Sequence, residues 1–518
     1  MDTNHPTRRS SRAPRTPTSI PVSIGFHRLI DELKLQVPLP AVRSEASSGA
    51  RKTVLADNLV IERYPSGYLP RGIMGHLRFA LRYEPIHLGV MAALFRALDR
   101  RQVEHWVRTE PTSKFGRRAW YLFELLTGQT LDVPDVMATG YIDLLDHKVH
   151  VVGHRTQIRR QRINDNLLGF SFFCPLVRRT RKIAQFLKQD LAEEARRLAW
   201  DLDAPATPGG HVHLPASPLS SFPSSDDLNS SSAALLSLQT AINEANPAFG
   251  LLYSRQRLLD LHALITGATT RETGWRQNQT AIVISWPAGA EEIRFIPPKP
   301  EDLSVLMLAW MKMAARLSTP GFTDPGVAAA VASYALLFLR PFEDGNNRLH
   351  RFLAQDIFQR LANSSGRVLP LTAALAFERS AHENVLLKFF SSIRGLIHYT
   401  RLPGESSIEV HNDTMELYRY FDATTQVEHF YARLEQCVRR DMEGSLRFFR
   451  HREAAMRRIA EVVTMPAARA QALAGLLWEW GDQVPAEVRR RFPEVTDKEW
   501  YRLEALATTR PLAGAASI

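Results

Sequence analysis

The chain has 518 residues, of which 45% are hydrophobic and 23% are charged, and its formal net charge is +11. This composition excludes a collagenous or wholly disordered protein, and the length predicts more than one hydrophobic core. The positive charge permits binding to nucleic acid, to an anionic membrane or to acidic proteins without choosing among them.

Neither a membrane span nor a disulfide framework is expected. No run of about 18 apolar residues occurs, so we expect no membrane-spanning helix and no membrane partner. Cys174 and Cys437 are too few and too far apart for a disulfide framework or a zinc site. A reducing, cytoplasmic location fits best, and secretion into a host cell stays open as an alternative.

Residues 1–53 begin with a basic segment rich in Ser and Pro, MDTNHPTRRSSRAPRTPTSIPVS. It lacks the apolar core of a secretory signal, so we predict a disordered basic leader over 1–53. A leader for type III secretion or organelle targeting has a similar composition. Residues 54–202 place apolar residues at three- and four-residue steps and predict a helical N-terminal extension.

Residues 203–232 are crowded with Pro, Gly and Ser and predict a linker or a long loop. A second helical block is expected over 233–402. It is interrupted at 280–295, where two β-rich runs around Pro-Ala-Gly-Ala predict a hairpin. The last block, 413–510, predicts a small helical C-terminal domain, and whether it binds DNA is left open.

Two groups of arginines precede the linker: Arg159, Arg160, Arg162, and Arg178, Arg179, Arg181. A nucleic-acid surface is one interpretation, although nothing else in the sequence supports it. A solvated or acid-paired face is the interpretation that we favour.

The stretch LLFLRPFEDGNNRLHRFL, residues 336–353, joins two predicted helices by a turn. Pro341 disfavours helical geometry at Arg340 and ends the first helix. Gly345 and Asn346 lead into the second helix, whose N-terminal amides and dipole suit a phosphate group.

The charged residues of this turn favour an anion and a metal ion. Arg348 and Arg351 lie three residues apart on one helix face and can clamp phosphate oxygens. Asp344 offers the carboxylate that Mg²⁺ uses beside substrate phosphates. Phe342 is expected to anchor the turn in the core.

This turn resembles the signature of Fic (Fido) domains, His-x-Phe-x-(Asp/Glu)-Gly-Asn-(Gly/Lys)-Arg-x-x-Arg, in six positions: Phe342, Asp344, Gly345, Asn346, Arg348 and Arg351. Further segments, including RFIPPKPEDLSVLM and INDNLLGFSFFCPLVRRTRKI, are similar to those of large bacterial Fic proteins. The resemblance implies a mainly α fold: a helical Fic core with a β-hairpin flap, an N-terminal helical extension and a small C-terminal helical domain.

The resemblance also implies an activity, which is transfer of AMP from ATP to a hydroxyl of a target protein with Mg²⁺. Asp344 would hold the metal. The hairpin at 280–295 would be the flap that aligns an unknown target protein by strand addition. The phosphates would be held by Gly345, Asn346, Asn347, Arg348 and Arg351.

Two residues depart from the family signature. Arg340 stands at the position of the catalytic histidine, and a guanidinium does not lose its proton in proteins. Asn347 replaces Gly or Lys, and we expect it to tolerate a positive φ there because Asn does so better than most residues. His350 is not an obvious replacement base, and we expect it to be structural.

Many Fic proteins restrain themselves with a helix whose glutamate pairs with the second arginine of the signature. Glu244, in SLQTAINEANP, is the candidate inhibitory residue, although Ala245 breaks the pattern. A solvated helix end explains the same residues equally well.

Three hypotheses follow. The chain is a Fic-type nucleotidyltransferase homologue that binds ATP and Mg²⁺ with impaired AMP transfer, because Arg340 cannot act as a base. It transfers a phosphoryl or another nucleotidyl group by altered chemistry. Alternatively, it is a non-catalytic pseudoenzyme that binds a protein or regulates gene expression.

Overall fold

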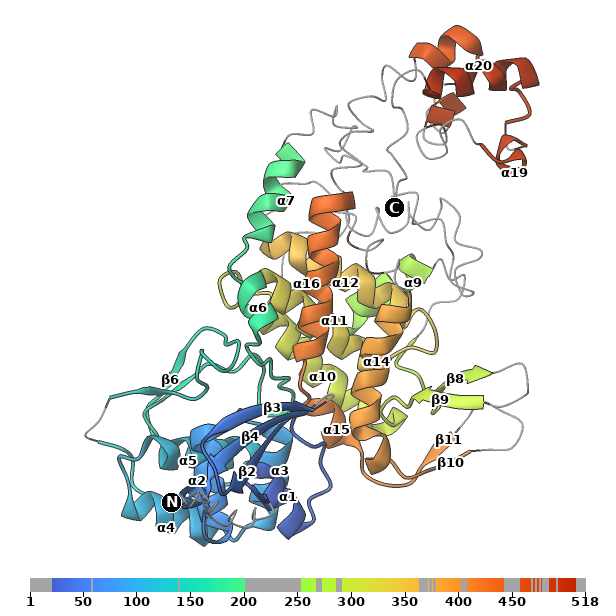
Figure 1. Ribbon diagram of the computed structural model, residues 1–518. Coiled ribbons are helices and arrows are strands. Elements are labelled where there is room, and N and C mark those ends of the chain that lie inside the picture. The colour runs from blue at the N-terminus through green and yellow to red at the C-terminus, as the bar shows by residue number, and fades with distance from the viewer. Residues whose placement is uncertain are drawn as a thin grey trace, which may run out of the picture. The chain divides into compact units, whose positions relative to one another are not determined.

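The computed structural model divides into two compact units, residues Met1–Ile142 with Arg159–Ile163, and residues Asp143–Ile158 with Asn164–Ile518 (Figure 1). The elements that it describes are mainly helices, which confirms the predicted fold class. The structure describes residues 21–56, 59–137, 140–200, 253–266, 273–285, 291–362, 371, 375, 379–401, 408–441, 457–466, 469–470, 473–474, 477, 484–490 and 492–508.

In its described residues, the first unit combines a four-stranded sheet with five α-helices. The strand order is β1-β2-β4-β3, in which β2 and β4 run parallel and the outer pairs run antiparallel. Its strands are β1 (Val22–Ile24), β2 (Val42–Ser47), β3 (Lys52–Ala56) and β4 (Leu59–Pro65). Its helices are α1 (Phe26–Leu33), α2 (Gly72–Tyr83), α3 (Leu88–Ala97), α4 (Arg100–Thr109) and α5 (Lys114–Thr127).

The predicted leader is too long, because three strands and a helix lie between Val22 and Ala56. Ile24, Phe26 and Ile30 are buried and anchor this segment to the unit. The composition of residues 1–53 is dominated by its first part, which hides these few apolar anchors. Residues 1–20 lie outside the described part of the chain.

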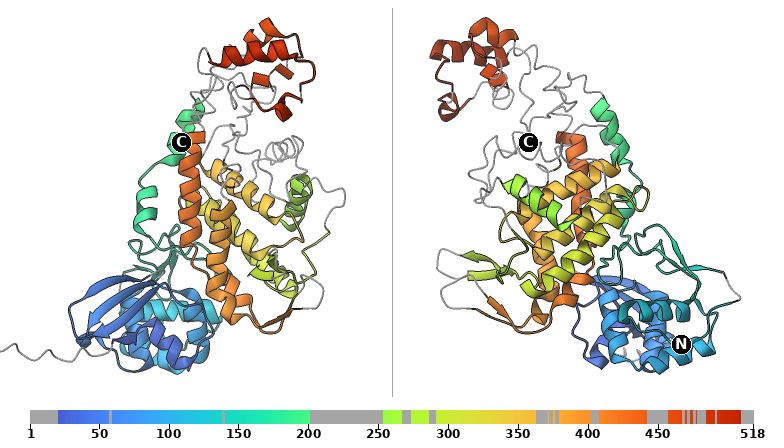
Figure 2. Two further views of the ribbon diagram at one scale, coloured as in Figure 1. Left: turned by 45° about the vertical axis from the view of Figure 1, so that its right-hand side comes forward. Right: turned by 180° about the vertical axis from the view of Figure 1, so that it is seen from behind.

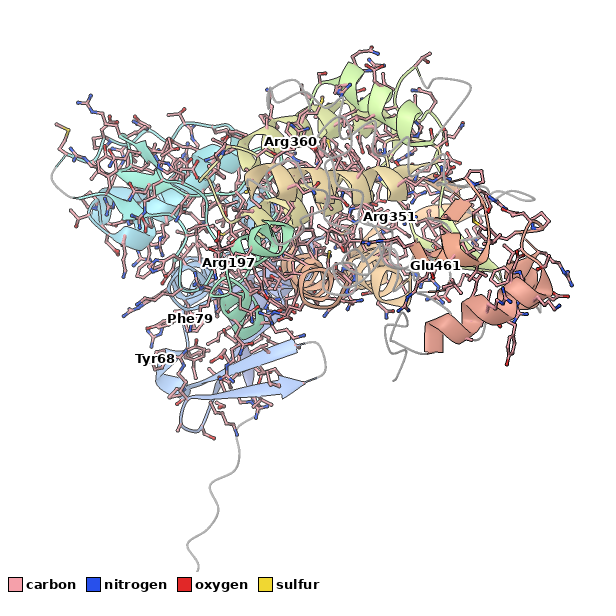
Figure 3. All side chains as sticks on the ribbon, turned by 90° about the horizontal axis from the view of Figure 1, so that it is seen from above. Tyr68, Phe79, Arg197, Arg351, Arg360 and Glu461 are labelled. Atoms are coloured by element: carbon pink, nitrogen blue, oxygen red, sulfur yellow. The ribbon has the colours of Figure 1, made fainter. Side chains whose placement is uncertain are left out.

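An aromatic cluster joins the sheet to α2. The ring of Tyr64 on β4 lies 5.1 Å from that of Phe79 on α2 and 5.5 Å from that of Tyr68. Figure 3 labels Tyr68 and Phe79. These contacts bury Tyr64 and hold the end of β4 against α2.

A buried carboxylate holds the start of α1. The amide of Phe26 donates to Glu84 at 2.8 Å. Gly25 has φ 70°, and a Cβ there would lie 2.1 Å from Oε1 of Glu84, so the position requires glycine. Burial raises the pKa of Glu84 to about 7, so the fold favours its neutral form.

One arginine of each predicted basic group is bound to an acidic partner. In the first unit, Arg160 donates to Asp135 at 2.7 Å. In the second unit, Arg178 donates to Asp422 at 2.7 Å. These pairs favour the acid-paired interpretation over a nucleic-acid surface.

The second unit is built around α11 (Pro325–Leu339), which is buried along its length from Gly326 to Leu339. It contacts α10 (Pro300–Leu317), α12 (Asn346–Leu361) and α16 (Thr424–Gln436), and Figure 2 shows this bundle from two further sides. The buried indole of Trp310 on α10 donates to the carbonyl of Ala332 at 2.8 Å. An apolar helix of small residues suits this central position, because neighbours can pack on every side.

Other helices of this unit are α6 (Arg181–Phe186), α7 (Leu191–Trp200), α9 (Arg255–Thr266), α14 (Arg379–Ile393) and α15 (Met415–Arg419). Short strands β5 (Ile142–Asp143), β6 (Thr156–Ile158) and β7 (Ile163–Asp165) lie earlier in the chain. In the parts of the chain that the structure describes, no helix is both long and apolar enough to cross a membrane.

The hairpin predicted at 280–295 is present. Strands β8 (Ile282–Ser285) and β9 (Glu291–Phe295) pair antiparallel, with an irregular register between Ile282 and Val283. Phe295 is buried in the core of the unit, so the base of the hairpin is fixed by packing. A second hairpin joins β10 (Tyr399–Arg401) to β11 (Ile408–Val410).

The sequence predicts a C-terminal domain that begins at residue 413, and the structure differs from this prediction. Val427, Phe430 and Leu434 on α16 belong to the same core as α11. A separate core cluster begins only at Ile459 and includes residues of α20 (Asp497–Thr508), with the short helix α19 (Ala486–Arg489) before it. The predicted linker at 203–232 lies outside the described residues.

The buried carboxyl of Glu84 generates a prediction about pH. Its folded-state pKa of about 7 exceeds the ordinary value of 4.5 for a glutamate carboxyl, so the stability that this group contributes is lost as pH rises through this window. We expect Glu84→Gln to raise the free energy of unfolding of the first unit by about 1–3 kcal/mol at pH 8 and by much less at pH 5. Hydrogen exchange of α1 and α2 amides in urea measures this difference.

Burial lowers the pKa of the His27 and His76 imidazoles, so the stability that these two residues contribute is lost as pH falls, the opposite of Glu84. Both residues are the same in the variant and the parent, so the comparison isolates Glu84. An equal difference between the two proteins at pH 5 and pH 8 would contradict the prediction.

Candidate functional site

The helix α11 ends where Pro341 predicts. The amide of Arg340 donates to the carbonyl of Leu336 at 3.0 Å, and Arg340 itself takes the left-handed conformation with φ 43°. A residue with a Cβ pays roughly 1–2 kcal/mol for this backbone region, so the surrounding contacts must hold Arg340 there. This kink turns the chain toward α12.

The buried side-chain amide of Asn346 closes the turn. Its Oδ1 accepts from the amide of Phe342 at 3.1 Å, and its Nδ2 donates to the carbonyl of Phe342 at 2.7 Å. Asn346 is only 1% exposed, so water cannot replace these two bonds. The predicted phosphate residue Asn346 therefore also has a structural task.

Phe342 anchors the turn in the core, as predicted. Its ring stacks on the imidazole of His262 on α9, with ring centres 4.0 Å apart, and meets Trp275 edge-on at 5.6 Å. The Nε2 of His262 lies 2.9 Å from the carbonyl oxygen of Asp344. Since a carbonyl only accepts, this nitrogen donates, and His262 fixes both the aromatic anchor and the backbone beside Asp344.

Gly345 is the N-cap of α12 and has φ 75°. A Cβ at this position would lie 2.5 Å from Cγ2 of Thr266 and 2.8 Å from Nε2 of His262. The first amide with a helical partner is that of Leu349, which donates to the carbonyl of Gly345 at 3.0 Å. Because the N-cap residue is a glycine, it has no side-chain oxygen with which to cap the first amides of α12.

Charged side chains surround this helix start. Glu343 and Asp344 are exposed, whereas Arg348 and Arg351 are half-buried on α12. Figure 3 labels Arg351. The Oε1 of Glu343 accepts from Nδ2 of Asn278 at 3.1 Å, which leaves Asp344 as the carboxylate suited to a ligand.

The residues present fit a phosphate-bound Mg²⁺ better than a metal site made by the protein alone. Among the described residues, no group of three His, Cys, Asp or Glu side chains could hold a metal ion. Mg²⁺ commonly takes one or two carboxylates together with substrate phosphates and water, which one exposed carboxylate at Asp344 can satisfy. The glycine at 345 is needed for a different reason, since Thr266 and His262 occupy the space of a Cβ there.

Sequence reasoning missed Arg276, which is 3% exposed and binds the turn from outside the signature. Its amide donates to the carbonyl of Pro341 at 2.8 Å, and its Nε donates to that of Arg340 at 2.9 Å. Burial lowers the pKa of Arg276 to about 10, and the nearby Glu343 carboxylate opposes this shift. Arg340 and Pro341 lie 64 and 65 positions after Arg276 in the chain, so no local sequence pattern predicts these bonds.

Three other expectations concern residues of the turn or its restraint. Asn347 is exposed and lies inside α12, and the positive φ values of the turn fall at Arg340 and Gly345. The expected need for Asn347 to tolerate a positive φ is therefore wrong. His350 is buried, with its ring 4.5 Å from that of Tyr334, as a structural role requires. Glu244 lies outside the described residues.

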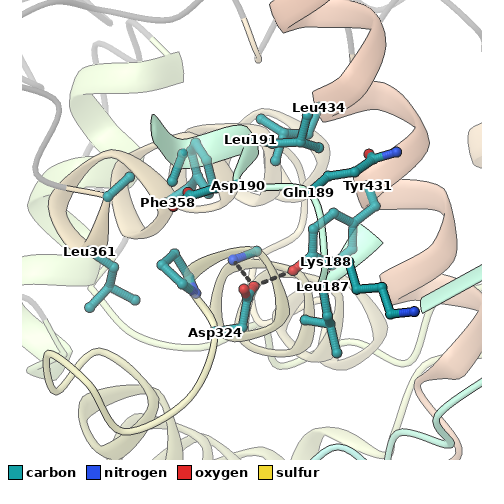
Figure 4. Close-up of a pocket in the computed structure, with 14 residues that line it drawn as sticks. Leu187, Lys188, Gln189, Asp190, Leu191, Asp324, Phe358, Leu361, Tyr431 and Leu434 are labelled. Atoms are coloured by element: carbon teal, nitrogen blue, oxygen red, sulfur yellow. Dashed lines mark hydrogen bonds between the residues drawn. The ribbon is translucent and has the colours of Figure 1, made fainter. Parts of the chain in front are cut away.

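A separate cavity of about 520 Å³ lies away from the turn (Figure 4). Its lining includes Asp324 and Pro325, where α11 begins, and Leu361, where α12 ends. The turn lies at the opposite ends of both helices, about 20 Å away for helices of this length. Asp324 accepts hydrogen bonds from the amide of Gly326 at 2.8 Å and from the hydroxyl of Tyr431, so this carboxylate caps α11.

The reciprocal bonds of Asn346 generate a prediction about stability. We expect Asn346→Ala to lower the free energy of unfolding by about 1–3 kcal/mol, because it leaves the buried amide and carbonyl of Phe342 without partners. Urea unfolding of the second unit measures the change. Asn347→Ala is the matched control, since it removes the same side chain from an exposed neighbouring position. Equal stability of the two variants would refute the role of Asn346.

Comparison with known proteins supports one family. The model of the Fic/DOC family matches residues 252–357, a region that contains α9, the β8–β9 hairpin, α10, α11 and most of α12. No curated protein matches the chain. Among solved structures, a Fic domain containing signaling protein from Bacteroides thetaiotaomicron is similar to it at 14% identity and a TM-score of 0.27. That match covers 52% of this chain and 90% of the other, and a similarity this low carries no argument about the site. The chain therefore contains a domain of the Fic/DOC family at residues 252–357.

Proposed function

We propose that the turn between α11 and α12 binds ATP with Mg²⁺ and that AMP transfer to a protein hydroxyl is impaired. The observation that carries this proposal is a turn closed by the side chain of Asn346 at the glycine start of α12, with Arg340 where the Fic signature has its histidine. The turn supports binding, and the residue at its first position argues against the proton transfer.

Binding is supported by the arrangement of donors. The first amides of α12 point out of the helix start, and the positive end of the helix dipole favours a phosphate. Arg348 and Arg351 lie on the same helix, one turn apart, and can add charge-assisted hydrogen bonds. In this proposal Asp344, an exposed carboxylate of the turn, holds Mg²⁺, which neutralises phosphate charge.

Impaired transfer follows from the chemistry of the guanidinium. In AMP transfer, a general base takes the proton of the attacking hydroxyl. A guanidinium stays protonated in proteins, so Arg340 cannot accept this proton. General-base help is typically worth ~10²–10⁴-fold in rate, which is the loss that we expect relative to a histidine at this position.

A second candidate function is a non-catalytic module that binds a protein partner through the hairpin. Arg340 favours it, since the residue that would act as base is absent, while the β8–β9 hairpin is kept. In this case, nucleotide occupancy would be a signal and not the start of a reaction.

The binding proposal predicts a dependence on Asp344 and Arg348. We expect calorimetry to detect ATP binding in the presence of Mg²⁺. Arg348→Ala should weaken it about 10–100-fold, because one charge-assisted hydrogen bond to phosphate is lost. Asp344→Asn should weaken binding only when Mg²⁺ is present.

Arg197→Ala is the control for net charge, since Arg197 is exposed on α7 and contacts Glu193. It should bind ATP like the parent. Absence of heat from the parent chain with ATP and Mg²⁺ would remove the nucleotide from this proposal.

The impaired-transfer proposal predicts that Arg340→His restores a proton acceptor. We expect label from α-labelled ATP to reach protein in a cell lysate with Arg340→His, alone or combined with Asn347→Gly, at a rate at least ~10²-fold above the parent chain. Asp344→Asn in the same background should abolish the label, because the metal carboxylate is lost.

The outcomes separate the hypotheses. Label from the parent chain that depends on Asp344 and Arg348 would refute the non-catalytic function. Transfer from γ-labelled and not α-labelled ATP would indicate altered chemistry. No label from any variant would mean that the defect extends beyond Arg340.

A further inference from the structure

One buried side chain joins the turn to both ends of the hairpin. The guanidinium of Arg276 donates to three backbone carbonyls: Arg340 at 2.9 Å, Asn278 at 2.8 Å, and Pro298. Asn278 precedes β8 and Pro298 follows β9, so these two residues mark the base of the hairpin. Arg340 is the first residue of the turn.

The arrangement is specific to arginine. A planar guanidinium carries five N–H donors in a fixed fork and can bond three carbonyls at once. A lysine ammonium is more compact than a guanidinium and cannot reach all three carbonyls at once. The cost of burying the cation is offset only if these bonds are made, so the three segments must keep their positions.

A second bridge runs beside the first. Glu343, in the turn, accepts from the side-chain amide of Asn278 at 3.1 Å and from its backbone amide at 3.4 Å. Unlike Arg276, Glu343 is exposed. The turn and the start of the hairpin are therefore linked twice, once inside the protein and once at its surface.

We propose that Arg276 is a positioning residue that couples the β8–β9 hairpin to the anion-binding turn, so that a nucleotide on the turn stabilises the hairpin. The coupling rests on the proposed nucleotide binding, whereas the positioning role does not. Any ligand that orders the backbone at Arg340 and Pro341 also orders the carbonyls that Arg276 holds. By linkage, a protein partner that pairs with the hairpin would strengthen nucleotide binding by the same factor.

Hydrogen exchange of the full chain without nucleotide tests the positioning role. In Arg276→Lys, we expect amides of the turn (Arg340, Phe342) and of the hairpin strands to exchange about 10–100-fold faster, because several bonds to a charged donor are lost. Amides in the middle of α10 and α11 should keep their rates. Equal acceleration everywhere would indicate a general loss of stability and would overturn the proposal.

Two further variants make the test independent of the fate of Arg276→Lys. Glu343→Ala removes the exposed bridge and should accelerate the same amides by a smaller factor. Arg316→Lys is the matched control, because Arg316 donates to the carbonyl of Gly169 at 2.8 Å, in the same unit and outside the turn. Acceleration of turn and hairpin amides in Arg316→Lys, or none in Glu343→Ala, would count against the proposal.

Addition of ATP and MgCl₂ tests the coupling. Hairpin amides of the parent chain should exchange more slowly with nucleotide, and those of Arg276→Lys should respond several-fold less. If calorimetry shows binding but hairpin exchange stays unchanged in the parent, the coupling is wrong. If calorimetry shows no binding, the proposed function and the coupling that rests on it both fail, while the nucleotide-free comparison still decides the positioning role.

Discussion

The site depends on the side-chain amide of Asn346, which bonds both backbone groups of Phe342 inside the protein. A buried amide and carbonyl without partners would cost more than most single contacts provide, so this pair fixes the path of the chain. The path places the ring of Phe342 against His262 and sets Gly345 at the start of α12. The helix dipole is useful for binding only because its N-terminus is held at a defined point.

Contacts on both sides of the turn explain how Arg340 keeps an unfavourable backbone conformation. On one side, α11 is buried from Gly326 to Leu339 and cannot rotate without breaking the core. On the other side, Arg276 donates twice to the turn: its side chain donates to the carbonyl of Arg340, and its backbone amide donates to the carbonyl of Pro341. A strain of roughly 1–2 kcal/mol is small beside these bonds. The surrounding contacts, and not the side chain at position 340, therefore determine the backbone conformation there.

The sequence predicts the parts of the site that follow local rules. Pro341 ends α11, a glycine starts α12, two runs rich in β-branched and aromatic residues form the hairpin, and Phe342 anchors the turn in the core. The contacts that Arg276 and His262 make with the turn could not be predicted, because these partners lie 64 to 82 positions away. The sequence predicts a helical block over 413–510, but periodicity does not say which core a helix joins. Composition likewise hid the anchors Ile24 and Phe26, because it averages over a segment.

The exchange of a histidine for Arg340 has opposite effects on binding and on chemistry. In addition to burial, the nearby guanidinium of Arg340 lowers the pKa of Arg276, so Arg340 adds positive charge to the turn and favours an anion there. The same group removes the proton acceptor that turnover requires. In the function that we propose, a nucleotide then stays on the turn as a ligand. A long-lived ligand is what the link through Arg276 needs, because the hairpin can respond only while the turn is occupied.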